Sequence, residues 1–185
     1  MGHNVVYYIT VKTFTAALRA LVIEEQKPHL EEAGRRLSET PGFPFSRPTL
    51  AASKTVFNLV APDNEFERRF AQFLQDAPNV TRFAKLPTPV GFTIEYTDSA
   101  ASLRYYEPDF VAVFDDNTHC LIETKGREDV DVAHKDRAAC LWCENATLLT
   151  GTIWRFLKVP QKEFEQLQPG EYADLVALAP SPIRA

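Results

Sequence analysis

Two short apolar runs within residues 105–127 constrain the fold of this chain more than any other feature. The stretch reads YYEPDFVAVFDDNTHCLIETKGR, and its apolar runs, residues 110–114 and 120–122, are separated by polar residues at 115–118. Asp, Asn and Thr side chains hydrogen-bond to their own backbone in turns. The pattern therefore predicts a β-hairpin, two antiparallel strands joined by a tight turn.

The predicted hairpin brings charged side chains together at its open end. Side chains alternate between the two faces of a strand, so Glu123 and Lys125 project from one face and Thr124 from the other. With the turn centred at residues 116–117, antiparallel pairing places Asp109 opposite Glu123 or Thr124, within one residue. Carboxylate oxygens bind Mg²⁺, and a lysine beside them can orient an attacking water. These groups are suited to metal-assisted hydrolysis of a phosphodiester.

The residues Pro108-Asp109, followed by Glu123-Thr124-Lys125, resemble the PD-(D/E)xK nuclease motif. More narrowly, the run from FNLVAPDNEFERRFAQFL through YYEPDF, LIETKGRE and the helix around Lys135 resembles the C-terminal endonuclease domain of type III restriction enzyme Res subunits. The resemblance covers the middle of the chain, residues 57–143. It implies an α/β fold, a restriction-endonuclease-like αβββαβ core in which helices flank a mixed central sheet.

The motif residues have roles in the hypothesis that follows from this resemblance. Asp109 and Glu123, with the backbone carbonyl of Thr124, would bind one or two Mg²⁺ ions, for which Mn²⁺ could substitute. Lys125 would orient the water and contact the phosphate. The expected activity is a Mg²⁺-dependent DNA endonuclease.

Two further site residues are assigned by the resemblance, each with an alternative. Glu67, in the string EFERRF, matches an acidic residue on the first core helix that points back to the metal; it would reach the metal through water or hold a second ion. Otherwise it is a solvated glutamate that pairs with a nearby arginine. Lys135 matches a lysine that faces the site and would hold a phosphate or steady Glu123. Otherwise it is an exposed lysine that pairs with Asp131.

Periodicity predicts the remaining elements. In the first half these are a strand at 5–12, a helix from residue 15 to Pro28, a second helix over 29–37, an irregular linker at 40–49, a strand at 54–60, and a helix at 65–75 capped by Asp63 or Asn64. In the second half they are an antiparallel meander of strands at 80–86, 91–97 and 103–109 with the hairpin, a helix capped by Asp129 or Asp131 and running to about residue 145, strands at 147–150 and 152–159, and short helices at 161–168 and 171–178.

These elements predict three segments. Residues 1–52 form an N-terminal extension or docking element, residues 53–160 the nuclease core, and residues 161–185 the C-terminal helices and tail. The proline-rich linker sets the first boundary, because Pro and Gly interrupt helices and strands.

Composition and charge bear on partners and location. A net charge of −5 disfavours strong DNA binding by the chain alone, because affinity comes mainly from Lys and Arg that neutralise phosphates. The resemblance to type III Res subunits implies an ATP-driven helicase or translocase partner or domain, in a restriction or anti-phage defence system. The sequence has no Walker-type phosphate-binding motif, so we do not expect this chain to be the motor. No apolar run reaches the roughly 18 residues of a membrane span. Three cysteines without framework spacing favour a reducing, cytoplasmic location.

Two other classes of function stay open. One is a nuclease-fold assembly module that binds a helicase or DNA without cutting. The other is a repair or transposase-type nuclease with the same core. The oligomeric state also stays open, with a homo-oligomer as one option.

Overall fold

A four-stranded mixed sheet forms the centre of the computed structural model, which describes residues 2–22, 27–31, 34–100, 102–126 and 132–178. The strands lie in the order β1 (Val80–Lys85), β4 (Phe110–Phe114), β5 (His119–Lys125) and β6 (Trp154–Pro160). The pairs β1–β4 and β4–β5 are antiparallel, whereas β5 and β6 are parallel. The structure is thus a mixed α/β fold, consistent with a restriction-endonuclease-like architecture.

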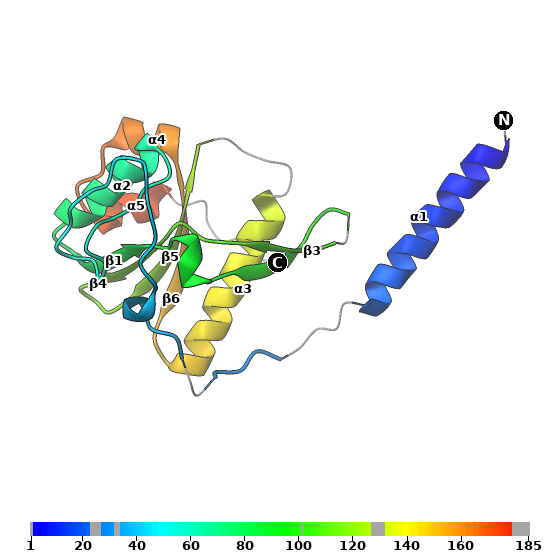
Figure 1. Ribbon diagram of the computed structural model, residues 1–185, viewed down its shortest axis with the longest axis horizontal. Coiled ribbons are helices and arrows are strands. Elements are labelled where there is room, and N and C mark those ends of the chain that lie inside the picture. The colour runs from blue at the N-terminus through cyan, green and yellow to red at the C-terminus, as the bar shows by residue number, and fades with distance from the viewer. Residues whose placement is uncertain (1, 23–26, 32–33, 101, 127–131, 179–185) are drawn as a thin grey trace.

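Helices cover both faces of this sheet (Figure 1). On one face lie α2 (Glu65–Asp76), α4 (Gln161–Leu167) and α5 (Tyr172–Leu178), and on the other lies α3 (Val132–Thr150). Buried side chains join each layer to the sheet: Phe70, Phe164 and Leu175 on the first face, and Ala139 and Cys143 on the second. The long parallel crossover through α3 places β6 beside β5, next to the predicted motif.

The helix α2 is fixed by its cap and its apolar stripe. The Asn64 side chain accepts a hydrogen bond from the backbone N–H of Glu67 at 2.9 Å, which satisfies a donor that the helix leaves free. Phe70 is fully buried, and its ring centroid lies 5.3 Å from that of Phe110 and 5.5 Å from that of Phe164. The helix, its N-cap and its core face are as the sequence predicted.

The hairpin of β4 and β5 confirms the prediction that started from the two apolar runs. Phe110 pairs with Ile122, and the turn closes with a hydrogen bond from the Phe114 N–H to the Thr118 carbonyl at 3.0 Å. Within the turn the Asp116 carboxylate accepts from the Thr118 N–H at 2.8 Å. The turn residues therefore act as expected, by hydrogen-bonding their own backbone.

The prediction that the strands at 80–86, 91–97 and 103–109 form one antiparallel meander with the hairpin is wrong. The strands β2 (Ile94–Thr97) and β3 (Leu103–Tyr106) pair only with each other as a separate two-stranded sheet, and β1 pairs directly with β4. Residues 91–93, expected to begin β2, are not in a strand; the short 3-10 helix η2 (Thr88–Val90) precedes them. Pro87 and Pro89 remove backbone donors there, so the chain leaves the main sheet before it can pair.

The N-terminal third also differs from the prediction. Residues 2–22 form one helix, α1 (Gly2–Val22), which lies apart from the sheet in Figure 1, so no strand exists at 5–12. Apolar residues at consecutive positions fit both periods, and the spacing of Tyr7, Val11, Phe14 and Leu18 is helical.

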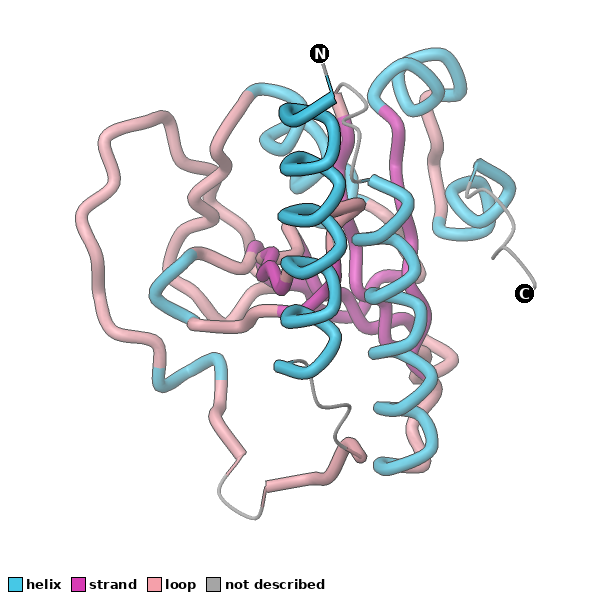
Figure 2. The backbone as a smooth tube through the Cα atoms, turned by 90° about the vertical axis from the view of Figure 1, so that its right-hand side faces the viewer, coloured by secondary structure: helices cyan, strands magenta, loops and turns pink. Residues whose placement is uncertain are grey.

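Between α1 and α2 the chain is mostly irregular. The helix expected at 29–37 is absent from its described residues, and η1 (Leu37–Glu39) is a single 3-10 turn. Figure 2 shows the long loop that leads from η1 into α2. The strand expected at 54–60 is reduced to one isolated bridge, between Leu50 and Val60. A single bridge orders little of the chain, so this segment has no ladder to hold it as a strand.

Downstream of the hairpin the main correction concerns residues 147–150. They form the last turn of α3 rather than a strand, and the hydroxyls bond within the helix: that of Thr147 donates to the Cys143 carbonyl at 2.8 Å and that of Thr150 to the Ala146 carbonyl at 2.7 Å. The short helices α4 and α5 are confirmed. The expected caps of α3 and the pairing of Lys135 with Asp131 fall outside the described residues.

Candidate active site

The two halves of the predicted motif meet at the open end of the hairpin. The Asp109 carboxylate accepts hydrogen bonds through Oδ2 from the Thr124 backbone N–H, at 2.8 Å, and from the Thr124 hydroxyl. Pro108 is fully buried, and the Asp109 carbonyl accepts from the Leu86 N–H at 2.8 Å. The strand end that carries Asp109 is therefore fixed on both sides, by β5 through its side chain and by β1 through its backbone.

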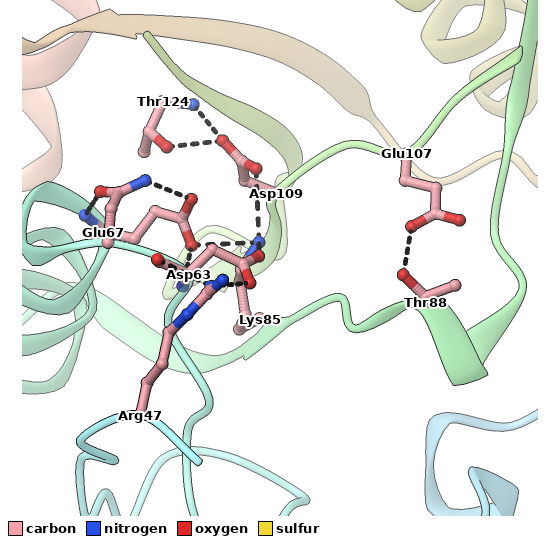
Figure 3. A network of polar contacts seen from close by, with 9 residues as sticks. Arg47, Asp63, Glu67, Lys85, Thr88, Glu107, Asp109 and Thr124 are labelled. Atoms are coloured by element: carbon pink, nitrogen blue, oxygen red, sulfur yellow. Dashed lines mark hydrogen bonds and ion pairs between the residues drawn. The ribbon is translucent and has the colours of Figure 1, made fainter. Parts of the chain in front are cut away.

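A lysine from β1 lies among three carboxylates beside this junction (Figure 3). The Lys85 Nζ lies 3.2 Å from Glu67 Oε2, 3.3 Å from Asp109 Oδ1 and 3.3 Å from Asp63 Oδ2. Lys85 is 4% exposed and Glu67 is 5% exposed. We call Asp63, Glu67, Asp109 and Lys85 the acid–lysine cluster.

Glu67 is placed by the N-terminus of α2. Its Oε2 accepts from the Asp63 backbone N–H at 2.8 Å, and its Oε1 accepts from the Asn64 side-chain amide at 2.8 Å. Arg68, the next residue, pairs with Glu65 instead, at 2.7 Å. Glu67 is thus a buried residue directed at Asp109 and Lys85, and the alternative of a solvated glutamate paired with an arginine does not describe its geometry.

Burial and charge act in opposite directions within the acid–lysine cluster. Burial raises the pKa of Glu67, against the opposing effect of the Lys85 ammonium. Burial also tends to lower the pKa of Lys85, but the charges of Asp109, Glu67 and Asp63 more than compensate and leave that pKa above its ordinary value. The cluster therefore keeps Lys85 charged at neutral pH.

Glu123 lies on the opposite face of the sheet, under α3. It lines a cavity of about 10 Å³, close to the volume of one water-sized sphere. The cavity is also lined by Tyr106, Lys125, Val132, Lys135, Asp136, Phe156 and Lys158. The Glu123 Oε2 is buried and has no hydrogen-bond partner among the described residues.

The surroundings of Glu123 shift its ionisation strongly. Burial, and then the negative charge of Asp109, raise the pKa of Glu123 to about 8, although Lys125 and Lys135 oppose the shift. A bound cation would lower this pKa, because it would both neutralise the carboxylate and contact the oxygen that lacks a partner.

The two predicted lysines lie on the same side as Glu123. Lys125 is the last residue of β5, and Lys135 lies in the first turn of α3, with its Nζ 5.8 Å from the centroid of the Tyr96 ring. Both line the Glu123 cavity. The predicted site residues therefore fall into two groups at one end of the sheet: Glu67, Asp109 and Thr124 towards α2, and Glu123, Lys125 and Lys135 towards α3.

The donors at this end of the sheet fit Mg²⁺ in kind. They are carboxylate and carbonyl oxygens, and the unpartnered Glu123 oxygen lacks the contact that a cation would supply. Among the described residues no group of three His, Cys, Asp or Glu side chains is arranged to hold a metal ion, and Glu67 and Asp109 are directed at Lys85. Mg²⁺ is commonly held by only one or two carboxylates and keeps several waters, so a smaller donor set suffices.

Comparison with known families decides the class of the protein. The family model described as the endonuclease domain matches residues 53–148, slightly more than half of the chain. The chain belongs to this endonuclease domain family. It is a restriction-endonuclease-like nuclease, and the matched region runs from before α2 through the hairpin and most of α3. No curated protein and no solved structure matches the chain.

None of the helices over residues 2–178, outside the short undescribed gaps, is long and apolar enough to cross a membrane.

Two residues of the acid–lysine cluster were missed from the sequence. Asp63 was considered only as a helix cap, and Lys85 was not considered. Alternation along β1 could have found Lys85, since it shares a face with Phe83, a core residue, and a lysine in that position needs buried partners. Nothing in the sequence indicated that those partners would be Asp63, Glu67 and Asp109.

Proposed function

We propose that this endonuclease domain cuts DNA in a Mg²⁺-dependent reaction, with a site like that of the PD-(D/E)xK nucleases and, more narrowly, of type III Res subunits. The observation that carries the proposal is the contact between Asp109 and Thr124, because it joins the Pro-Asp half to the Glu-x-Lys half of the motif. The unpartnered oxygen of Glu123 lies at the same end of the hairpin.

The chain supplies oxygen ligands and positive charge to such a site. Asp109, Glu123 and the Thr124 carbonyl would hold Mg²⁺ or Mn²⁺, and Glu67 would act on the bound ion through water. The bound ion lowers the pKa of a water and offsets charge on the phosphate. Lys125 and Lys135 contact the phosphate and orient the water beside Glu123. Glu123 loses its proton before it acts as a ligand, since only the carboxylate form binds a cation well.

Cleavage of supercoiled plasmid tests this proposal. We expect the purified chain to nick or linearise plasmid in Mg²⁺ or Mn²⁺ and not in EDTA. Asp109→Asn, Glu123→Gln and Lys125→Ala should each lower the rate at least about 100-fold, the scale of a lost electrostatic or acid–base group.

Lys162→Ala is the control, because Lys162 is an exposed lysine on α4 that does not line the Glu123 cavity. It should cut at the wild-type rate. Wild-type cleavage by all three site variants, or cleavage that survives EDTA, would contradict the proposal.

We further propose that residues 1–52 dock a helicase-like motor in a restriction or anti-phage defence system, that residues 53–160 are the nuclease core, and that residues 161–185 extend it. Tyr7, Val11, Phe14 and Leu18 recur at helical spacing on α1, and all four are exposed. The net charge of −5 also favours delivery of DNA by another component. Phe14→Asp should leave the melting temperature unchanged and abolish any stimulation of cleavage by the motor.

One observation favours a second candidate, an assembly module that binds without cutting. Lys85 engages both Glu67 and Asp109, so two of the carboxylates expected near the metal already have a positive partner. Calorimetry separates the two functions: an assembly module binds neither Mg²⁺ nor Mn²⁺, whereas the nuclease binds both.

A further inference from the structure

The acid–lysine cluster has the composition of a cation-binding site, except that a lysine ammonium lies among the carboxylates. Three carboxylates from three different segments converge on one ammonium group: Asp63 from the loop before α2, Glu67 from α2, and Asp109 from the residue just before β4. The Lys85 Nζ lies at nearly equal distances from all three, 3.2 to 3.3 Å. The same ammonium lies 5.5 Å from the centroid of the Phe110 ring, within cation–π range.

A simple structural ion pair does not account for this arrangement. One buried lysine needs one carboxylate for charge balance, but this lysine has three, so the cluster carries excess negative charge around a single positive group. Arg47 offsets part of the excess at the exposed side, since its Nη1 lies 2.8 Å from Asp63 Oδ1. Glu67 and Asp109, the inner pair, are joined through Lys85.

Convergence of like charges requires a cation between them. Without one, Glu67 and Asp109 would repel each other in a partly buried environment, where water screens poorly. The Lys85 stem extends from β1 with Phe83 and Phe110 on the same face of the sheet, so the ammonium is fixed by packing as well as by charge.

We propose that Lys85 is a positioning residue that occupies, with its ammonium, the place of a second divalent cation between Glu67 and Asp109. It holds both carboxylates in their converged positions before any metal binds and leaves a single metal position, on the Glu123 side of Asp109. This inference rests on the proposed function for its role in cleavage, but its structural content can be measured without DNA.

Thermal unfolding of Lys85→Met with and without Mn²⁺ tests the inference. In EDTA the variant should melt about 10 °C below the wild type, because it leaves buried carboxylates without a partner. Millimolar Mn²⁺ should restore most of this loss, since a divalent ion enters the vacated position, and it should raise the wild-type melting temperature much less. Lys85→Arg, which keeps the charge, should respond to Mn²⁺ as the wild type does.

Lys54→Met is the matched control. Lys54 is a partly buried lysine at the opposite, C-terminal end of α2, and its Nζ donates to the Ala77 carbonyl at 2.6 Å rather than to carboxylates. Its loss should lower the melting temperature without any extra recovery in Mn²⁺. A structural role for Lys85 alone would give the same result as Lys54, so equal Mn²⁺ responses of the two variants would overturn the inference.

A double variant keeps the test decisive if Lys85→Met does not fold. Adding Glu67→Gln removes one of the repelling charges, so the double variant should be more stable in EDTA than Lys85→Met alone; a double variant no more stable than the single would overturn the inference. The melting data also separate the two proposals. Mn²⁺-dependent recovery in a chain that cuts no DNA would contradict only the proposed function, and cleavage without such recovery would contradict only this inference.

Discussion

Glu123 is the residue whose ionisation most affects the site. Its pKa is raised to about 8, mainly by burial, whereas in an unfolded chain a glutamate titrates near 4.3. Between these two values the folded chain binds more protons than the unfolded chain. The free energy of unfolding in the absence of metal should therefore fall as pH rises through this window, by at most about 1.4 kcal/mol per pH unit.

Glu123→Gln should flatten this pH dependence, since the amide does not ionise. Urea unfolding in EDTA at several values between pH 5 and about pH 8 would measure it. The control is Glu171→Gln, an exposed glutamate near α5, which should keep the wild-type slope. An unchanged slope in Glu123→Gln would show that another group is responsible.

The same protonation should appear in metal binding. Mg²⁺ competes with the proton on Glu123, so the affinity for Mg²⁺ should increase as pH rises towards about 8 and level off above it. Calorimetric titrations at pH 6, 7, 8 and 9 would measure this directly. An affinity that is independent of pH across this range would contradict the assignment of Glu123 as a ligand.

The Thr124 hydroxyl fixes the orientation of Asp109 and offers a mild test of the motif junction. Thr124→Val removes the hydroxyl donor and keeps the backbone N–H bond, so it should cost about 0.5–1.5 kcal/mol of unfolding free energy. Thr124→Ser keeps the donor and should cost less. If valine and serine have equal effects on unfolding, the hydroxyl contact contributes nothing.

Among the elements, α2 links the core to the candidate site, because its cap residue and its third residue belong to the same hydrogen-bond network. Asn64→Ala should cost about 1 kcal/mol through loss of the N-cap, and it should also weaken metal-dependent cleavage because Glu67 loses a donor. Asn64→Ser keeps the cap but not the amide donor to Glu67. We therefore expect Asn64→Ser to be as stable as the wild type but to cleave DNA more slowly.

The opposite face of α2 tests the packing of the fold. Phe70→Ala should lower the free energy of unfolding by about 3–5 kcal/mol, because a fully buried ring that contacts Phe110 and Phe164 is replaced by a cavity. Phe14→Ala, at an exposed position on α1, is the control and should be close to neutral. Similar losses in both variants would mean that α1 packs against the core in solution.

The elements that could be predicted share a strong local signal. The β4–β5 hairpin has alternation on both sides of a turn cluster, and α2 has a cap followed by a regular apolar stripe, so each is specified within its own residues. Residues 5–12 fit strand and helix periods equally, and residues 147–150 are threonine- and leucine-rich, which favours a strand until the hydroxyls are seen to bond within the helix. The separate pairing of β2 and β3 depends on long-range packing that has no local pattern.

At the scale of the whole molecule, the sequence predicted that Asp109, Glu123 and Lys125 lie at one end of the sheet. It did not predict that Asp109 faces α2 whereas Glu123 and Lys125 face α3. The register along the hairpin follows from alternation. The direction of the Asp109 side chain depends instead on its contacts with Thr124 and with Lys85, which lies on β1, a strand that is far from β4 in sequence but beside it in the sheet. Lys85 could be recognised only once β1 was known to lie beside β4. The family match, residues 53–148, covers this end of the sheet but not α1 or β6.

Calorimetric titration of Mn²⁺ at about pH 8.5, above the pKa of Glu123, tests most directly whether the two halves of the motif form one cation site. We expect one ion per wild-type chain, and at least about tenfold weaker binding in both Asp109→Asn and Glu123→Gln, equivalent to about 1.4 kcal/mol or more. Wild-type affinity in either variant would contradict a shared site, and no binding by the wild-type chain would contradict the metal-dependent nuclease altogether.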